Sequence, residues 1–215
     1  MHLQNMQYTA TVGAYSVLEE YIVQISGCED LRVQKTVTAI RETFSEMILR
    51  TDYDKITVTD LCKCAKINKK TFYRYYETLD ALLEELLEEL TQGFLKRIAD
   101  YRVPEDLPEI NREFFVFSEA QGKLYERIIC ASAHNEISGK MIGDIINRTW
   151  NTSVSFRKLS KYEQSILLRF INDVGTNLYR QWVSDGKKIP LSRIITLSNE
   201  LLCCGVNGFM NVTKE

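Results

Sequence analysis

The side chains best suited to chemistry in this sequence are cations gathered in one short window. Residues 62–76 carry five cations and no acid, and these are Lys63, Lys66, Lys69, Lys70 and Arg74. A local cluster of positive charge favours contact with a polyanion, because phosphate binding depends on local rather than net charge. The alternative is a solvated helix face, and composition alone favours that alternative.

The cluster belongs to a chain whose overall charge is close to zero. The 215 residues carry a formal net charge of −2, with 45% hydrophobic and 26% charged residues. Residues 1–30 hold four acids and no base, whereas residues 31–80 hold ten bases and seven acids. The positive charge is therefore concentrated around the cluster.

Other kinds of functional site find little support in the sequence. We see no nucleophile–base pair and no phosphate-binding loop, so we expect neither an enzyme nor a cofactor. His2 and His134 are the two histidines, and the six cysteines form no C-x-x-C pair, so no metal site is expected. Lysines near Cys62 and Cys64 could lower their thiol pKa values and make a redox sensor, although side chains two apart on a helix point in different directions.

Helices are the elements that must position the cluster. The chain has three prolines and ten scattered glycines, which favours an all-α fold. Apolar residues recur at helical spacing through residues 31–50 and predict a helix that packs by one side. Thr57, followed three positions later by Asp60, predicts the start of a short second helix, and Asn68 is a suitable cap for a third.

The third helix, over residues 69–76, carries most of the cations. Phe72 and Tyr76 are i, i+4 neighbours and should face the core. The opposite surface then offers Lys69, Lys70, Thr71, Tyr73, Arg74 and Tyr75 to solvent.

The pattern remains helical towards the C-terminus. Thr78 can cap a fourth helix that runs to residue 102, and further helices are predicted near 104–119, 136–156, 160–186 and 190–211. A short leading helix is predicted over residues 14–26. No window reaches the roughly 18 apolar residues of a membrane span, and the N-terminus lacks a secretory pattern. We therefore expect a cytoplasmic protein without a membrane partner.

Residues 57–76 supply the parts of a helix-turn-helix, in which a second helix enters the major groove of DNA. The stretch TVTDLCKCAKINKKTFYRYYETLDALLEE resembles the DNA-binding pattern of the TetR family of transcriptional regulators. The matching residues are Thr57, Val58, Asp60, Leu61, Ala65, Ile67, Thr71, Phe72, Tyr73, Tyr75, Asp80, Leu82 and Leu83. The chain departs from the pattern at Lys66, where the family has a turn glycine, and at Leu79, where it has a lysine.

The resemblance implies a fold with two parts and a set of DNA-binding residues. The expected parts are an N-terminal extension (1–30), a three-helix DNA-binding domain (31–90) and a helical effector-binding and dimerisation domain (91–215). The residues expected to contact double-stranded operator DNA are Thr57, Thr59, Asn68, Lys69, Lys70, Thr71, Tyr73, Arg74 and Tyr75.

The C-terminal part is expected to bind an effector and a second subunit. The resemblance implies that the last two helices pair with their copies in a homodimer, through Phe170, Val174, Leu178, Leu197, Leu201 and Cys204. An excess of apolar surface on these helices fits a symmetric dimer, and a monomer core is the alternative. Candidate residues for a pocket that holds an unknown small-molecule effector are Phe114, Phe117, Tyr125, Cys130, His134 and Trp150.

The sequence therefore predicts a homodimeric, DNA-binding transcriptional regulator, with a repressor released by its effector as the expected mode. The alternative is a helical interaction protein that acts through a partner protein and binds little DNA itself. The departures at Lys66 and Leu79 motivate this alternative, which predicts no salt-dependent affinity for DNA.

Overall fold

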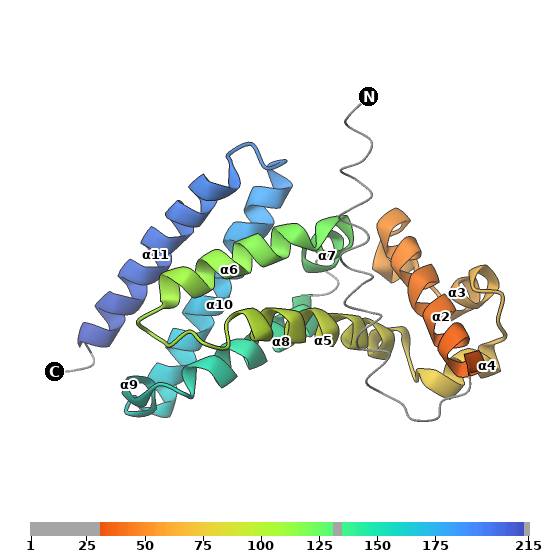
Figure 1. Cartoon of the computed structure of the whole chain (residues 1–215), viewed down its shortest axis with the longest axis horizontal. Coiled ribbons are helices and arrows are strands. Elements are labelled where there is room, and N and C mark those ends of the chain that lie inside the picture. Colours follow the sequence, from red (N-terminus) through yellow and green to blue (C-terminus); the bar gives the residue numbers. More distant parts are fainter. Residues whose placement is uncertain (1–30, 131–134, 213–215) are drawn as a thin grey trace. The chain divides into compact units, whose positions relative to one another are not determined.

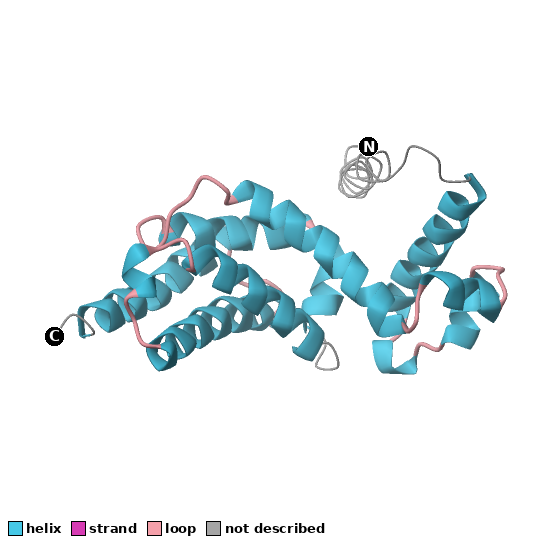
Figure 2. Ribbon diagram, turned by 90° about the horizontal axis from the view of Figure 1, so that it is seen from below, coloured by secondary structure: helices cyan, strands magenta, loops and turns pink. Residues whose placement is uncertain are grey.

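The structure is a computed structural model that describes residues 31–130 and 135–212. These residues form helices joined by short connections and contain no strand, which confirms the all-α fold class (Figures 1 and 2). The helix predicted over residues 14–26 lies outside the described residues, as does the rest of the N-terminal extension.

The chain divides into two compact units, and the boundaries fall inside helices. The described part of unit 1 comprises residues 31–82 and 120–127, and unit 2 comprises the remainder. The helices that begin in unit 1 are α2 (Leu31–Arg50), the one-turn η1 (Tyr53–Lys55), α3 (Val58–Cys64), α4 (Lys69–Tyr75) and α5 (Leu79–Arg97). Helix α7 (Gly122–Cys130) also begins in unit 1, and both α5 and α7 continue into unit 2.

Unit 1 is held together by an apolar core at the contacts of α2 with α3 and of α3 with α4. Ile40, Phe44 and Ile48 follow one another every four residues along α2, and their side chains are buried. Leu61 of α3 and Phe72 of α4 are fully buried. The buried stripe predicted for residues 31–50 is therefore present, and the predicted bounds of that helix match α2.

Unit 2 contains the longer helices and a larger core. Besides the rest of α5 and α7, it contains α6 (Leu107–Ala120), α8 (Asn135–Trp150), α9 (Val154–Arg157), α10 (Lys161–Ser184) and α11 (Leu191–Val212). Helix α10 contacts both α8 and α11. Its first turn has a capping box, in which Ser160 and Glu163 each accept a hydrogen bond from the other's backbone amide.

Two predicted helices end earlier than expected. The fourth helix ends at Arg97 instead of residue 102, and in the connection that follows the Arg102 amide donates to the Asp106 carboxylate at 2.8 Å. The helix predicted over 136–156 is interrupted after Trp150. Ser153 there accepts a hydrogen bond from the Phe156 amide and so begins the separate short helix α9.

Helices α10 and α11 approach closely where a glycine leaves room for an aromatic ring. A Cβ at position 205 would overlap the ring of Phe170, so any residue larger than Gly205 would require the ring to move. Helix α6 is joined to α11 by a buried polar contact, since the Asn111 amide donates to the Ser198 hydroxyl at 3.0 Å. Within residues 31–130 and 135–212, no helix is long and apolar enough to cross a membrane.

Candidate nucleic-acid interface

Helix α4 is fixed by a cap at one end and by a buried aromatic ring at its centre. The Asn68 side chain accepts hydrogen bonds from the amide of Thr71 at 2.8 Å and from its hydroxyl at 3.0 Å. Phe72 is fully buried, and its ring lies 5.8 Å from that of Tyr76, which is also buried. Both aromatic residues therefore face the core, as the spacing predicts, and they set which face of α4 remains outside.

The outer face of α4 carries cations and hydroxyl groups. Lys69, Lys70 and Arg74 are exposed, and 55% of Tyr73 is accessible to solvent. The guanidinium of Arg74 lies 6.0 Å from the centre of the half-buried Tyr75 ring, within the range of a cation–π contact. Such a face offers long, mobile cations and rigid hydroxyl-bearing rings on one short helix, a combination suited to nucleic acid.

The two threonines at the start of α3 differ in whether their hydroxyl group makes hydrogen bonds within the chain. Thr57 accepts a hydrogen bond from the Asp60 amide at 3.1 Å and donates one to the Asp60 carboxylate at 2.6 Å. Thr57 is therefore the cap of α3, as predicted, and its hydroxyl is engaged within the chain. Thr59 is exposed on the first turn of the same helix.

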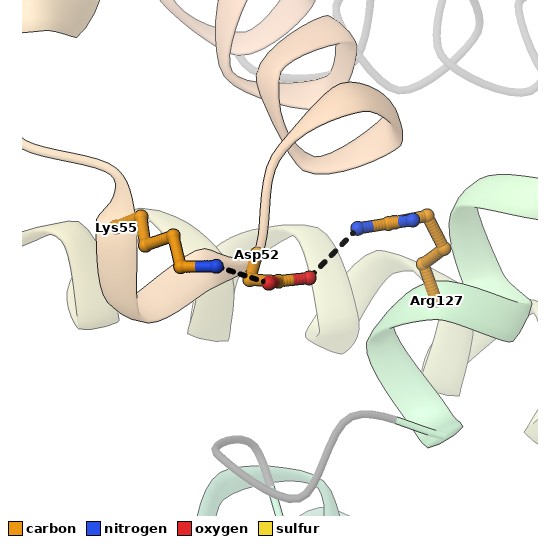
Figure 3. A network of polar contacts seen from close by, with 3 residues as sticks. All are labelled: Asp52, Lys55 and Arg127. Carbon is orange, nitrogen blue, oxygen red and sulfur yellow. Dashed lines mark hydrogen bonds and ion pairs between the residues drawn. The ribbon is translucent and has the colours of Figure 1, made fainter.

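An ionic network that the sequence does not reveal holds the connection between α2 and α3 (Figure 3). One carboxylate oxygen of Asp52 accepts from Lys55 Nζ at 2.8 Å, and the other accepts from Arg127 of α7 at 3.3 Å. The hydrogen bond and charge of Lys55, and then Arg127, lower the pKa of Asp52. The same pairing with Asp52 raises the pKa of Lys55.

We expect Asp52→Asn to lower the melting temperature at neutral pH. The difference in melting temperature between the variant and the wild type should become smaller under acidic conditions. The Asp52 carboxyl has a folded pKa below its usual value of 3.8. Its contribution to stability is therefore present above that usual value and is lost as the pH falls through the folded pKa. Melting curves recorded across this range test the prediction. A constant difference at every pH would show that the variant acts through packing and not through charge.

The Cys62 thiol does not have the properties of a redox sensor. Cys62 is buried in unit 1, and this burial raises the pKa of its thiol despite the opposing effect of the nearby Lys69. The reactive thiolate form is therefore disfavoured. Cys64 is exposed on the opposite side of the same helix.

Of the candidate effector residues, Phe114 and Phe117 pack against the same ring, that of Phe94. Phe117, Tyr125 and Trp150 are buried, Phe114 is half-buried, and Cys130 is exposed, whereas His134 lies outside the described residues. None of them lines an open groove of about 720 Å³ in unit 2. The groove is lined by the connection before α6, by the segment around α9 and by the end of α11, with Arg102, Val103, Glu105, Thr152, Ser153, Val154, Ser155, Lys158, Leu159 and Met210.

The candidate dimer residues fall into an inner and an outer group. Phe170 and Val174 pack against the core between α10 and α11, and Leu178 is also half-buried. On α11, by contrast, 36% of Leu197 and 58% of Leu201 are accessible, and Cys204 is exposed on the same stripe. Tyr162 and Ile166 of α10 add apolar surface that is 84% and 60% accessible.

Sequence comparison finds one distant relative, which is described as a transcriptional regulator. The chain is 28% identical over 158 residues to YxbF, an uncharacterised HTH-type transcriptional regulator of Bacillus subtilis. The aligned region covers 72% of this chain but only 38% of YxbF. No protein-family model matches the sequence.

The solved structures described below, whose backbones are similar to that of this chain, are regulators that share one fold. A TetR transcriptional regulator from Streptococcus agalactiae superposes with a TM-score of 0.62 at 20% identity, over 80% of this chain and 95% of that one. The fatty acid degradation regulator FadR from Bacillus halodurans gives 0.54 at 16% identity, over 78% and 94% of the two chains. The Thermus thermophilus TetR-family repressor FadR gives 0.51 at 19% identity, over 78% and 93%. This chain therefore has the fold of the TetR family of transcriptional regulators.

Proposed function

We propose that this protein is a sequence-specific DNA-binding transcriptional regulator. The observation that carries the proposal is the position of α4, whose buried Phe72 leaves Lys69, Lys70 and Tyr73 on the outer face. A short helix with this face can enter the major groove, where lysine side chains reach guanine edges and phosphates and tyrosine hydroxyls reach phosphates. The similarity to YxbF over 158 residues supports the same function.

The protein acts in this proposal as a homodimer that binds two half-sites. The exposed apolar stripe of α11 and the exposed Tyr162 and Ile166 of α10 provide surface for a second copy. In such a dimer the two α4 helices read successive major grooves about 34–36 Å apart. Any change in that spacing weakens binding to both half-sites together.

Release from DNA follows from the binding of a small molecule to unit 2. The groove of about 720 Å³ has the size of a ligand pocket and combines apolar residues with two cations, Arg102 and Lys158. The Thermus thermophilus FadR structure was solved in complex with lauroyl-CoA, and it supports a ligand-controlled mechanism for this chain. An effector needs only to prefer the DNA-incompetent conformation by a few kcal/mol to release a repressor.

The proposal is tested by measuring binding to the DNA upstream of the protein's own gene. Fluorescence anisotropy at several salt concentrations compares this fragment with a shuffled fragment of equal length. We expect the native fragment to bind at least about 1,000-fold more tightly than the shuffled one. Equal affinity for both fragments, or no binding even at low salt, would reject the proposal and favour a protein that acts through a partner protein.

A further inference from the structure

Two lysines have a backbone conformation that normally favours glycine. Lys66 has a φ of 55° and Lys187 a φ of 56°, and they are the only residues other than glycine with positive φ in the described ranges 31–130 and 135–212. The left-handed conformation brings the Cβ of an L-residue close to a carbonyl oxygen and is therefore strained. A residue keeps such strain when its side chain makes a compensating contact or has a function.

Lys66 occupies the position of a helix-ending motif at which glycine is the usual residue. After α3, the Ile67 amide donates to the Cys62 carbonyl at 3.0 Å and the Lys66 amide to the Lys63 carbonyl at 3.3 Å. This pair of bonds is the Schellman motif, whose left-handed residue is commonly glycine. The turn between α3 and α4 therefore requires a positive φ, and a glycine would satisfy it without strain.

Helix α10 ends with the same motif and does have glycine at this position. The Lys187 amide donates to the Trp182 carbonyl at 2.9 Å, and the amide of Gly186, whose φ is 72°, donates to the Val183 carbonyl at 2.9 Å. The same chain thus uses glycine at the left-handed position of one Schellman motif and lysine at the other. The lysine at α3 is not imposed by the backbone.

The strain at Lys187 is compensated by contacts of its side chain. Lys187 Nζ lies 2.6 Å from the Glu119 carboxylate and 5.2 Å from the centre of the Trp182 ring. An ion pair and a cation–π contact together account for a lysine at this position.

Lys66 has no such contact. Its side chain is exposed and makes no ion pair, hydrogen bond or ring contact with any residue in 31–130 or 135–212. Nothing within the described protein therefore offsets the strain at Lys66.

We infer that Lys66 binds a phosphate of the DNA backbone, and that this contact compensates for its strained conformation. The inference rests on the proposed function and adds a contact that a glycine in the turn cannot make. A lysine ammonium neutralises a phosphate and releases a counterion, which makes the contact measurable through its salt dependence. Lys66 therefore strengthens binding to any DNA sequence and does not select bases.

The test compares Lys66→Gly, Lys66→Asn and Lys66→Arg with the wild type. Both uncharged variants accept a positive φ, and Lys66→Gly should raise the melting temperature by about 4 °C. In the same variants, the slope of log K against log salt concentration should fall by about 0.9 for each bound subunit. Affinity per subunit should weaken about fivefold at about 0.15 M salt. Lys66→Arg should keep the wild-type slope.

A matched control removes the same charge elsewhere. Lys188→Gln replaces an exposed lysine of unit 2 and should leave the slope unchanged. If Lys66→Gly binds DNA with the wild-type slope, the inference is wrong and the proposed function stands. If the wild-type protein has no salt-dependent affinity for DNA, the proposed function fails and the inference fails with it.

Discussion

The double variant Lys69→Ala/Lys70→Ala should bind the protein's operator about 100-fold more weakly for each bound subunit than the wild type, with an unchanged fold. Both lysines lie in the first turn of α4 and are exposed. A lysine that reaches a base edge or phosphate contributes about 1–3 kcal/mol, so the loss of two such contacts gives this effect. Alanine has the highest helix propensity, and the Asn68 cap and the buried Phe72 remain in place. Anisotropy titrations at one salt concentration measure the effect, and circular dichroism verifies the helix content.

The appropriate control is Lys96→Ala/Lys188→Ala, which removes two exposed lysines from unit 2. This variant has the same net charge as the α4 variant, and its affinity should change less than about twofold, because exposed charges more than about 10 Å from the DNA are screened. Equal losses in both variants would attribute binding to net charge alone. Wild-type affinity in the α4 variant would mean that α4 does not contact DNA.

The parts of the interface that could be predicted from the sequence depend on local interactions. The caps at Thr57 and Asn68 each act on an amide three residues away, and the burial of Phe72 follows from helical spacing. Such patterns lie within one or two turns of helix, so they are visible in a short stretch of sequence. The order and bounds of α2, α3 and α4 were predictable for this reason.

Contacts between distant parts of the chain could not be predicted in the same way. Asp52 and Arg127 are 75 residues apart, and Asn111 and Ser198 are 87 residues apart. No local pattern links these pairs, because their proximity depends on how whole helices pack. The position of the groove in unit 2 depends on the same packing, which explains why none of the predicted effector residues lines it.

The turn at Lys66 shows where a sequence pattern is informative but incomplete. A lysine in place of the turn glycine leaves open whether the backbone avoids a positive φ or adopts it. The structure shows that the backbone at Lys66 adopts a positive φ, of 55°. The residue type alone therefore indicated a departure, and only the geometry shows that the departure has an energetic cost.

The variant Leu201→Asp should convert the proposed dimer to a monomer at micromolar concentration. Leu201 lies on the exposed stripe of α11, and 58% of it is accessible in the single chain. In a two-fold symmetric dimer each substitution occurs twice, so two carboxylates would be placed within one apolar interface. Burying unpaired carboxylates costs several kcal/mol, and the dissociation constant should rise by about 100-fold or more. Sedimentation equilibrium should then give the mass of one 24.9 kDa chain.

Val154→Asp is the matched control, because Val154 has a similar accessibility of 61% but belongs to α9 and not to the stripe of α11. The Val154→Asp variant should remain dimeric. The Leu201→Asp variant should lose DNA affinity in addition to dimerisation, because a monomer occupies one half-site and loses the contribution of the second. Helix α4 is unchanged in Leu201→Asp, so its weak residual binding should keep the sequence preference of the wild type. A dimeric Leu201→Asp protein would place the subunit interface elsewhere. If the wild-type protein itself sediments as a monomer, the proposal that the stripe of α11 binds a second copy is wrong.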